Sequence, residues 1–202
     1  MKLKSLITPL GYMPMPVFTD TQVYMEPFEL GMPVLPLALK LWEDLTRAAV
    51  AHIVGGVGTA FLTVDQKVVH RGLTHRRPGP HVDGNYLHSW RQGDWKTGGA
   101  GRELPPELHR ASYCAPGGGM LIASSHALCR AWVGEYEGEP GQGGDCQHLA
   151  DAGVLDRMDS FLLEPFVLYL ANSTCIHASL PSGEDIRRSL FRITLPHTLN
   201  VH

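Results

Sequence analysis

The stretch HRRPGPHVDGNY, residues 75–86, sets His81 and Asp83 two residues apart. In an extended segment, residues i and i+2 point to the same side, so the imidazole and the carboxylate can be aimed at one point. The Pro-Gly-Pro before them and the glycine after them restrict the backbone and predict a strand that ends in a sharply bent loop. This segment therefore predicts two of the ligands of a metal site.

A third ligand has to come from a distant part of the chain, and His177 is the candidate. It follows the apolar run LEPFVLYLAN, residues 163–172, which predicts a buried strand, and it precedes the last predicted hairpin. Two imidazoles and one carboxylate on one side of a metal leave coordination positions open, as in non-haem Fe(II) sites. The alternative is that His81 and Asp83 form a hydrogen-bonded loop pair and that His177 is a buried histidine with an ordinary partner.

The rest of the chain predicts a mainly β protein with flanking helices. Residues 36–51, PLALKLWEDLTRAAVA, predict a helix with apolar residues opposite Lys40, Glu43, Asp44 and Arg47. Residues 52–75 alternate in polarity and predict two strands joined by a turn at Asp65-Gln66. Further strands are expected within 119–138, 163–172, 173–181 and 186–196, and Gly-rich loops at 91–119 and 139–153.

This order of elements predicts a double-stranded β-helix, that is, a cupin-like jelly roll with a helix packed outside. We expect one domain over residues 1–202, since this length buries a full core. A Pro-rich segment and the packing helix occupy residues 1–50, and the jelly-roll core occupies about 52–196. The density of proline in residues 1–36 predicts an extended chain that covers one face.

The last predicted strand carries three arginines, Arg187, Arg188 and Arg192. Arg188 and Arg192 fall on one face, and the apolar neighbours of Arg192 favour an inward orientation. A buried arginine requires an anionic partner because an unpaired buried charge is costly. A guanidinium matches a carboxylate in bidentate fashion, which predicts an organic acid bound beside the metal site.

These residues together resemble the Fe(II)- and 2-oxoglutarate-dependent dioxygenases. The resemblance lies in HVD at 81–83, in His177 and in RRSLFRIT at 187–194, which is similar to the end of taurine-dioxygenase-like members. It implies that His81, Asp83 and His177 are iron ligands. It also implies that Arg188 holds the distal carboxylate of 2-oxoglutarate with help from Arg192. Many members use an Arg-x-Ser pair instead, which Arg187 and Ser189 also satisfy.

The resemblance further implies a jelly-roll fold and an activity. Such an enzyme uses Fe(II), 2-oxoglutarate and O2 to hydroxylate a C–H bond, with release of succinate and CO2. The substrate is either a nucleic-acid base, in the manner of TET/JBP oxygenases, or a small molecule or peptide. The candidates for substrate contact are Tyr86, His88, Trp90 and Arg77, which lie beside the HVD motif in a basic and aromatic segment.

Two other readings remain open from the residues alone. One is a non-catalytic, cupin-like protein that binds a metal and an acid. Zinc binding by His126, Cys129, Cys146 and His148 is a further alternative, although the spacing matches no common zinc pattern.

Composition and cysteine spacing limit the partners and the cellular compartment that we expect for the protein. The net charge of −3 provides no global attraction to nucleic acid or to an anionic membrane. The four cysteines form no CxxC pair, which favours free buried thiols in a reducing compartment. The N-terminal apolar run is broken by prolines, and no window reaches the length of a membrane span. These features predict a cytoplasmic protein without a membrane segment.

Overall fold

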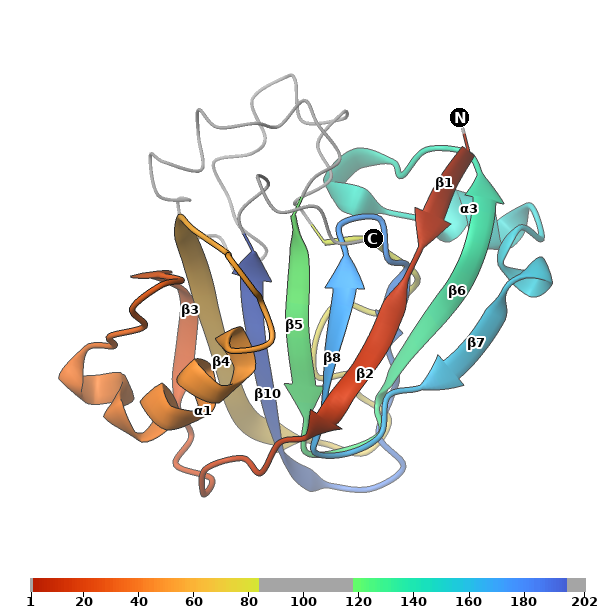
Figure 1. Cartoon of the computed structure of the whole chain (residues 1–202). Helices are drawn as coiled ribbons and strands as arrows, with labels where there is room; N and C mark the ends of the chain where they lie inside the picture. Colours follow the sequence, from red (N-terminus) through yellow and green to blue (C-terminus); the bar gives the residue numbers. More distant parts are fainter. Residues whose placement is uncertain (1, 84–117, 196–202) are drawn as a thin grey trace.

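The computed structural model describes residues 2–83 and 118–195, and two antiparallel sheets form its framework (Figure 1). The larger sheet has six strands, in the order β2 (Ile7–Tyr12), β8 (Val167–Asn172), β5 (Gly119–Ser124), β10 (Ile186–Leu195), β4 (Thr59–Val69) and β3 (Gln22–Glu29). The expected mainly β architecture is confirmed.

The second sheet is built around β6 (Cys129–Glu137). It pairs with β7 (Asp159–Leu162), with β1 (Lys2–Ser5) and with β9 (His177–Ser179), each in antiparallel orientation. Only Leu6 separates β1 from β2, so the chain passes directly from one sheet to the other at this residue. Residues of both sheets meet in a common core, as in a β-sandwich.

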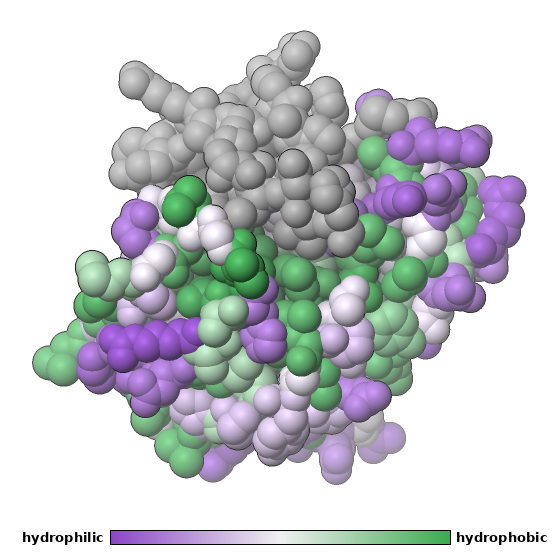
Figure 2. Space-filling view, in the orientation of Figure 1, coloured by the Kyte–Doolittle hydropathy of each residue, from purple (hydrophilic) through white to green (hydrophobic). Residues whose placement is uncertain are grey.

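The predicted helix is confirmed as a single 3₁₀ turn, Leu37–Leu39, followed by α1 (Lys40–Val50). It lies against the outer face of the six-stranded sheet (Figure 1). Its residues Trp42 and Ala49 are buried on the side that faces the sheet, whereas Leu37 and Leu41 are exposed. A hydrophilic stripe crosses the surface at the position of α1 (Figure 2), in keeping with the exposed Arg47.

Glu43 departs from the expected polar face of this helix, because its side chain is only 2% exposed. Its carboxylate accepts a hydrogen bond from the backbone N–H of Leu35 and forms ion pairs with Lys40 and Arg47. The two long cationic side chains cover the carboxylate while their charged ends stay near water. Helical periodicity reports polarity alone and does not reveal such a pairing.

The six-stranded sheet has two different faces, which β10 displays most clearly. Phe191, Ile193 and Leu195 enter the core beneath α1, where the ring of Phe191 stacks on Trp42 at a centroid distance of 6.2 Å. Leu190 packs on the other side, in the core between the sheets. Because side chains alternate along a strand, Arg188 and Arg192 share the side of Leu190.

The predicted turn at Asp65-Gln66 is wrong, since both residues lie inside β4 and pair with β10 without interruption. The Gln66 side chain is fully buried, accepts a hydrogen bond from the backbone N–H of Thr19 and donates one to Ser189 Oγ. Polar residues are therefore tolerated in this inner strand because each has a specific partner.

The N-terminal segment is extended, as expected, and it contributes β1, β2 and β3 to the two sheets. β2 and β3 are the edge strands of the six-stranded sheet, and each contains a proline, Pro9 and Pro27. Proline lacks a backbone N–H, so an edge strand accommodates it without loss of a ladder hydrogen bond.

The predicted loop at 139–153 contains a 3₁₀ turn (Gln142–Gly144) and the short helix α3 (Gln147–Asp151), and a further 3₁₀ turn spans Leu155–Arg157. Together they cover a third apolar cluster around Val82 and Ile176. Most of the predicted loop at 91–119 lies outside the described residues.

Cys129, Cys146 and Cys175 are buried free thiols, in agreement with the expectation for these three cysteines. Burial raises the pKa of each to about 12, so they stay protonated at neutral pH. Within residues 2–83 and 118–195, no helix has the length and apolar character to cross a membrane.

Candidate metal centre

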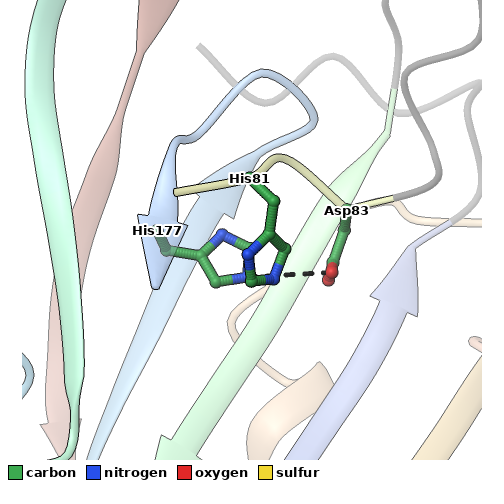
Figure 3. A group of neighbouring side chains, drawn as sticks. All are labelled: His81, Asp83 and His177. Atoms are coloured by element: carbon green, nitrogen blue, oxygen red, sulfur yellow. Dashed lines mark ion pairs between the residues drawn. The ribbon is translucent and has the colours of Figure 1, made fainter. Parts of the chain in front are cut away.

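The backbone brings His81 and His177 side by side. The backbone N–H of each donates to the carbonyl of the other at 2.9 Å, which makes them a hydrogen-bonded antiparallel pair. Directly opposed residues in such a pair project to the same face, and the two ring centroids are 4.5 Å apart. One short bridge between distant segments thus assembles two of the three predicted ligands (Figure 3).

Alternation along residues 81–83 provides the third ligand. Val82 points away into the apolar cluster and is 1% exposed, so His81 and Asp83 project to the opposite side. A ligand atom from each of His81, Asp83 and His177 lies within 4.8 Å of the other two. Among the described residues, this is the one group with the composition and spacing to hold a metal ion.

The orientation of both imidazoles is set by backbone carbonyls. His81 Nδ1 lies 2.9 Å from the carbonyl oxygen of Gly79, and His177 Nδ1 lies 3.2 Å from that of Cys175. A carbonyl oxygen only accepts, so each Nδ1 carries the proton in the neutral ring and each Nε2 keeps its lone pair. This is the tautomer required for ligation through Nε2.

The charge state of the group also suits a cation. Burial lowers the pKa of His81 to about 3, so its ring is neutral at physiological pH. Burial raises the pKa of the Asp83 carboxyl, but the positive charges around it, Arg192 first among them, together outweigh burial and hold that pKa well below its usual range. His81 therefore presents a neutral nitrogen donor, and Asp83 presents a carboxylate, without a proton having to leave either residue.

Asp83 itself has two distinct oxygens. Oδ2 accepts a hydrogen bond from Arg192 Nη1 at 2.8 Å, and Oδ1 lies 3.7 Å from His177 Nε2. One oxygen thus faces the histidines while the other is held by an arginine.

A loop from the region after β6 supports the HVD segment from behind. The backbone N–H of Val82 donates to the carbonyl of Gly144 at 2.8 Å. Gly144 has φ +79, and a Cβ at this position would lie 2.3 Å from the carbonyl oxygen of Val82. Arg77 ties the same loop down through the Gly143 carbonyl and the Asp145 carboxylate.

Arg188 occupies a buried polar site on the inner face of β10, where it is 1% exposed. Its guanidinium donates to Ser124 Oγ at 2.9 Å and to Ser179 Oγ at 3.5 Å. Burial lowers the pKa of Arg188 to about 10, so the group remains charged at neutral pH. Among the described residues no carboxylate forms an ion pair with Arg188, and its hydrogen-bond partners are neutral hydroxyls, although the charge of Asp65 favours its charged form from a distance.

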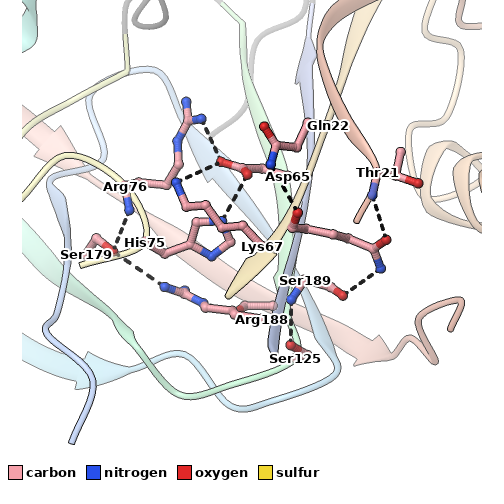
Figure 4. Close-up of polar contacts among 12 residues, drawn as sticks. Thr21, Gln22, Asp65, Lys67, His75, Arg76, Ser125, Ser179, Arg188 and Ser189 are labelled. Carbon is pink, nitrogen blue, oxygen red and sulfur yellow. Dashed lines mark hydrogen bonds and ion pairs between the residues drawn. The ribbon is translucent and has the colours of Figure 1, made fainter. Parts of the chain in front are cut away.

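A second polar cluster lies beside Arg188 and is centred on Asp65 (Figure 4). The Asp65 carboxylate contacts His75 Nε2 at 3.2 Å, Arg76 Nη1 at 3.0 Å and Lys67 Nζ at 3.7 Å. Burial lowers the pKa of His75 and the charge of Arg188 adds to this effect, although Asp65 opposes both. Asp65 is therefore the anion that offsets several cations at this end of the sandwich.

The other sequence-predicted residues have different places. Arg187 is exposed, and its guanidinium lies over the ring of Phe18. Ser189 bonds to Gln66 and to Ser125, so the Arg187–Ser189 alternative is not brought to the metal centre. Arg77 holds the supporting loop, and Tyr86, His88 and Trp90 lie outside the described residues.

Three residues near the site were missed from the sequence. Asp65 and His75 belong to the cluster beside Arg188, and the side chain of Tyr24 hydrogen-bonds with Arg192. The buried run around Asp65 offered a signal, because a charged residue within an apolar strand requires a partner. Nothing local in the sequence distinguishes Tyr24.

The alternative zinc cluster does not assemble among the described residues. His148 Nε2 contacts the carbonyl of Glu139, and His126 Nδ1 contacts Ser125 Oγ. Cys129 and Cys146 lie in separate apolar clusters.

Comparison of the chain with family models, curated proteins and solved structures gives no match.

Proposed function

We propose that the protein is an Fe(II)- and 2-oxoglutarate-dependent oxygenase that hydroxylates a C–H bond of its substrate, within a fold of the jelly-roll type. The observation that supports it most is the His81–Asp83–His177 group, with one ring nitrogen of each histidine and one carboxylate oxygen gathered within 4.8 Å. Two imidazoles and one carboxylate on a single side are the donor set that favours non-haem Fe(II) with open positions.

The buried charge of Arg188 supports an acid as the co-substrate. A guanidinium that is 1% exposed and bonded to two serine hydroxyls is stabilised by a carboxylate that enters its site. In this proposal Arg188 holds the distal carboxylate of 2-oxoglutarate, and Ser124 and Ser179 keep the guanidinium in position. Iron, 2-oxoglutarate and O2, when bound, supply the oxidative chemistry and yield succinate and CO2.

The chain's own residues contribute position and electrostatics. His81, His177 and Asp83 hold the metal from one side and leave its other side open to ligands. The inner face of β10 sets Arg188 on the same side of the sheet as Arg192, whose partner is Asp83. The proposal leaves the substrate as a nucleic-acid base or a small molecule or peptide.

Anaerobic titration with Fe(II) and 2-oxoglutarate tests the proposal. We expect a weak visible charge-transfer band in the mixture and release of succinate when air is admitted. Asp83→Ala should abolish both signals, and Arg188→Gln should weaken the band while metal binding is retained. His70→Gln serves as the matched control, because His70 is exposed and pairs with Asp185.

The result that contradicts the proposal is a wild-type protein that binds Fe(II) and yields neither the band nor succinate. That outcome would favour the cupin-like binding protein without turnover. Where succinate does appear, its release with panels of DNA oligonucleotides and of free amino acids identifies the substrate class.

A further inference from the structure

Arg192 and Arg188 lie on one face of β10, yet they have different partners. Arg188 donates to serine hydroxyls, whereas Arg192 Nη1 donates to Asp83 Oδ2 at 2.8 Å. The Arg192 side chain is 11% exposed, and that of Asp83 is 16% exposed. Arg192 is thus committed to a metal-ligating residue, although the resemblance to known oxygenases predicts that it assists in holding the acid.

The contact leaves Asp83 with one oxygen for a metal. Oδ2 is taken by the guanidinium, and Oδ1 lies on the side of His177 Nε2, 3.7 Å away. A carboxylate that binds a metal through one oxygen is commonly fixed by a hydrogen bond to the other oxygen, which prevents rotation about its C–C bond. The geometry is therefore that of a carboxylate preset for one-oxygen ligation.

Arg192 is fixed in turn by Tyr24 on the edge strand β3. The Tyr24 side chain forms a hydrogen bond with Arg192, and Arg192 in turn forms an ion pair with Asp83. The Tyr24 ring also lies beneath Arg76, whose Cζ is 5.4 Å from its centroid. Tyr24 therefore packs between Arg192 and Arg76, which form ion pairs with Asp83 and Asp65, respectively.

An irregularity of β3 accounts for the position of Tyr24. The pairing of β3 with β4 shifts register between Val23 and Glu26, and Met25 has φ +57, which is unfavourable for a residue with a side chain. The backbone N–H of Met25 donates to Thr63 Oγ1 at 3.3 Å. A bulge of this kind re-aims the neighbouring side chain, and such strain is often found beside functional sites.

We propose that Tyr24 and Arg192 are positioning residues of the metal centre, which hold Asp83 as a one-oxygen ligand, and that Arg192 does not anchor the co-substrate. The inference rests on the metal-binding part of the proposed function and does not require turnover. Two physical effects compete here. The charge of Arg192 repels an incoming cation, while its hydrogen bond to Oδ2 orients the carboxylate. We infer that orientation dominates, since loss of such outer partners typically weakens metal binding about 10- to 100-fold.

The test is titration with Co²⁺, whose visible absorption reports both affinity and ligand geometry. We expect Arg192→Gln to weaken Co²⁺ binding by about 10- to 100-fold and to change the shape of its absorption bands. Arg192→Lys, which retains charge without the planar fork, should recover part of the affinity. Tyr24→Phe should weaken binding in the same direction by a smaller factor. Arg130→Gln and Tyr12→Phe, at exposed positions, should leave Co²⁺ binding unchanged.

Titration with 2-oxoglutarate at saturating Co²⁺ separates the two arginines. Arg188→Gln should lose affinity for 2-oxoglutarate while Co²⁺ binding persists, and Arg192→Gln should retain affinity for 2-oxoglutarate. The inference is overturned if Arg192→Gln binds Co²⁺ as tightly as the wild type, or loses 2-oxoglutarate instead. Should Arg192→Gln fail to fold, Tyr24→Phe decides alone, and unchanged Co²⁺ affinity and spectrum overturn it. Failure of the wild type to bind 2-oxoglutarate would sink the proposed function and leave this inference standing.

Discussion

The outer and inner faces of β10 differ sharply although they belong to the same ten residues. Outward, Phe191, Ile193 and Leu195 fill an apolar core beneath α1, and Phe191 is 0% exposed. Inward, Arg188 and Arg192 carry buried charge, and Arg192 pairs with the candidate metal ligand Asp83. An apolar face gains free energy from burial alone, whereas a charged face requires partners for every group. The sheet can hold a charged interior because its opposite face anchors it.

The largest effect should come from breaking the outer face. Phe191→Ala removes a ring that stacks on Trp42, and we expect it to cost about 3–5 kcal/mol in the free energy of unfolding. Denaturant unfolding measures this cost. Below the unfolding transition, Co²⁺ affinity should remain that of the wild type, and a large loss of affinity would show that the two faces are not independent.

A smaller effect should follow from breaking the inner face away from the metal. Asp65→Asn removes the anion that pairs with His75, Arg76 and Lys67. We expect a loss of about 1–3 kcal/mol in the free energy of unfolding, because cations remain without their partner. Urea unfolding at neutral pH provides the measurement. A variant as stable as the wild type would show that water already compensates these charges.

The pH dependence of stability should further distinguish the charged inner face of the sheet from its apolar outer face. The pKa of His75 is lowered in the folded protein, so the unfolded chain binds a proton more readily as pH falls below about 6.5. The metal-free protein should therefore lose stability from pH 7 to 5, by at most about 1.4 kcal/mol per pH unit for each such histidine. His81, whose pKa is lowered to about 3, acts in the same direction.

His75→Gln should flatten this pH profile, measured by urea unfolding at several pH values. The charged groups that face His75 are Asp65, Arg188 and Lys67. Asp65, with its lowered pKa, and Arg188 keep their charge between pH 5 and 7. An unchanged slope in His75→Gln would show that folding does not lower the pKa of His75.

The smallest effect is expected at the exposed face of the second sheet. Arg130→Gln on β6 should change the free energy of unfolding by less than about 0.5 kcal/mol, because Arg130 is exposed. Thermal unfolding measures this difference, and a larger loss would reveal a contact important to β6.

Much of the candidate site was readable from local spacing. The i, i+2 relation of His81 and Asp83 needs only an extended backbone, and the helical pattern around Trp42 needs only a single apolar stripe. The convergence of His177 with His81 was expected from the resemblance, and the bridge between their backbones accounts for it physically. Each of these features depends on few residues that are close in sequence or directly paired.

What could not be predicted depends on partners far along the chain. Asp65 and Gln66 were assigned to a turn because polar pairs favour turns, yet their partners lie on residues 75–76, on β10 and near Thr19. Glu43 was assigned to the surface because the cations that cover it are invisible to periodicity. The position of Tyr24 depends on the positive φ of Met25, and methionine has no preference for that backbone conformation.

The close approach of Gly144 to Val82 has a consequence for natural and laboratory variation. Even alanine at position 144 would drive a methyl group into the Val82 carbonyl, and the φ of +79 adds strain of its own. In a saturation-mutagenesis screen scored by metal-dependent signal, this glycine should tolerate replacement as poorly as the ligands themselves. A residue without any functional group would then rank among the most sensitive positions of the protein.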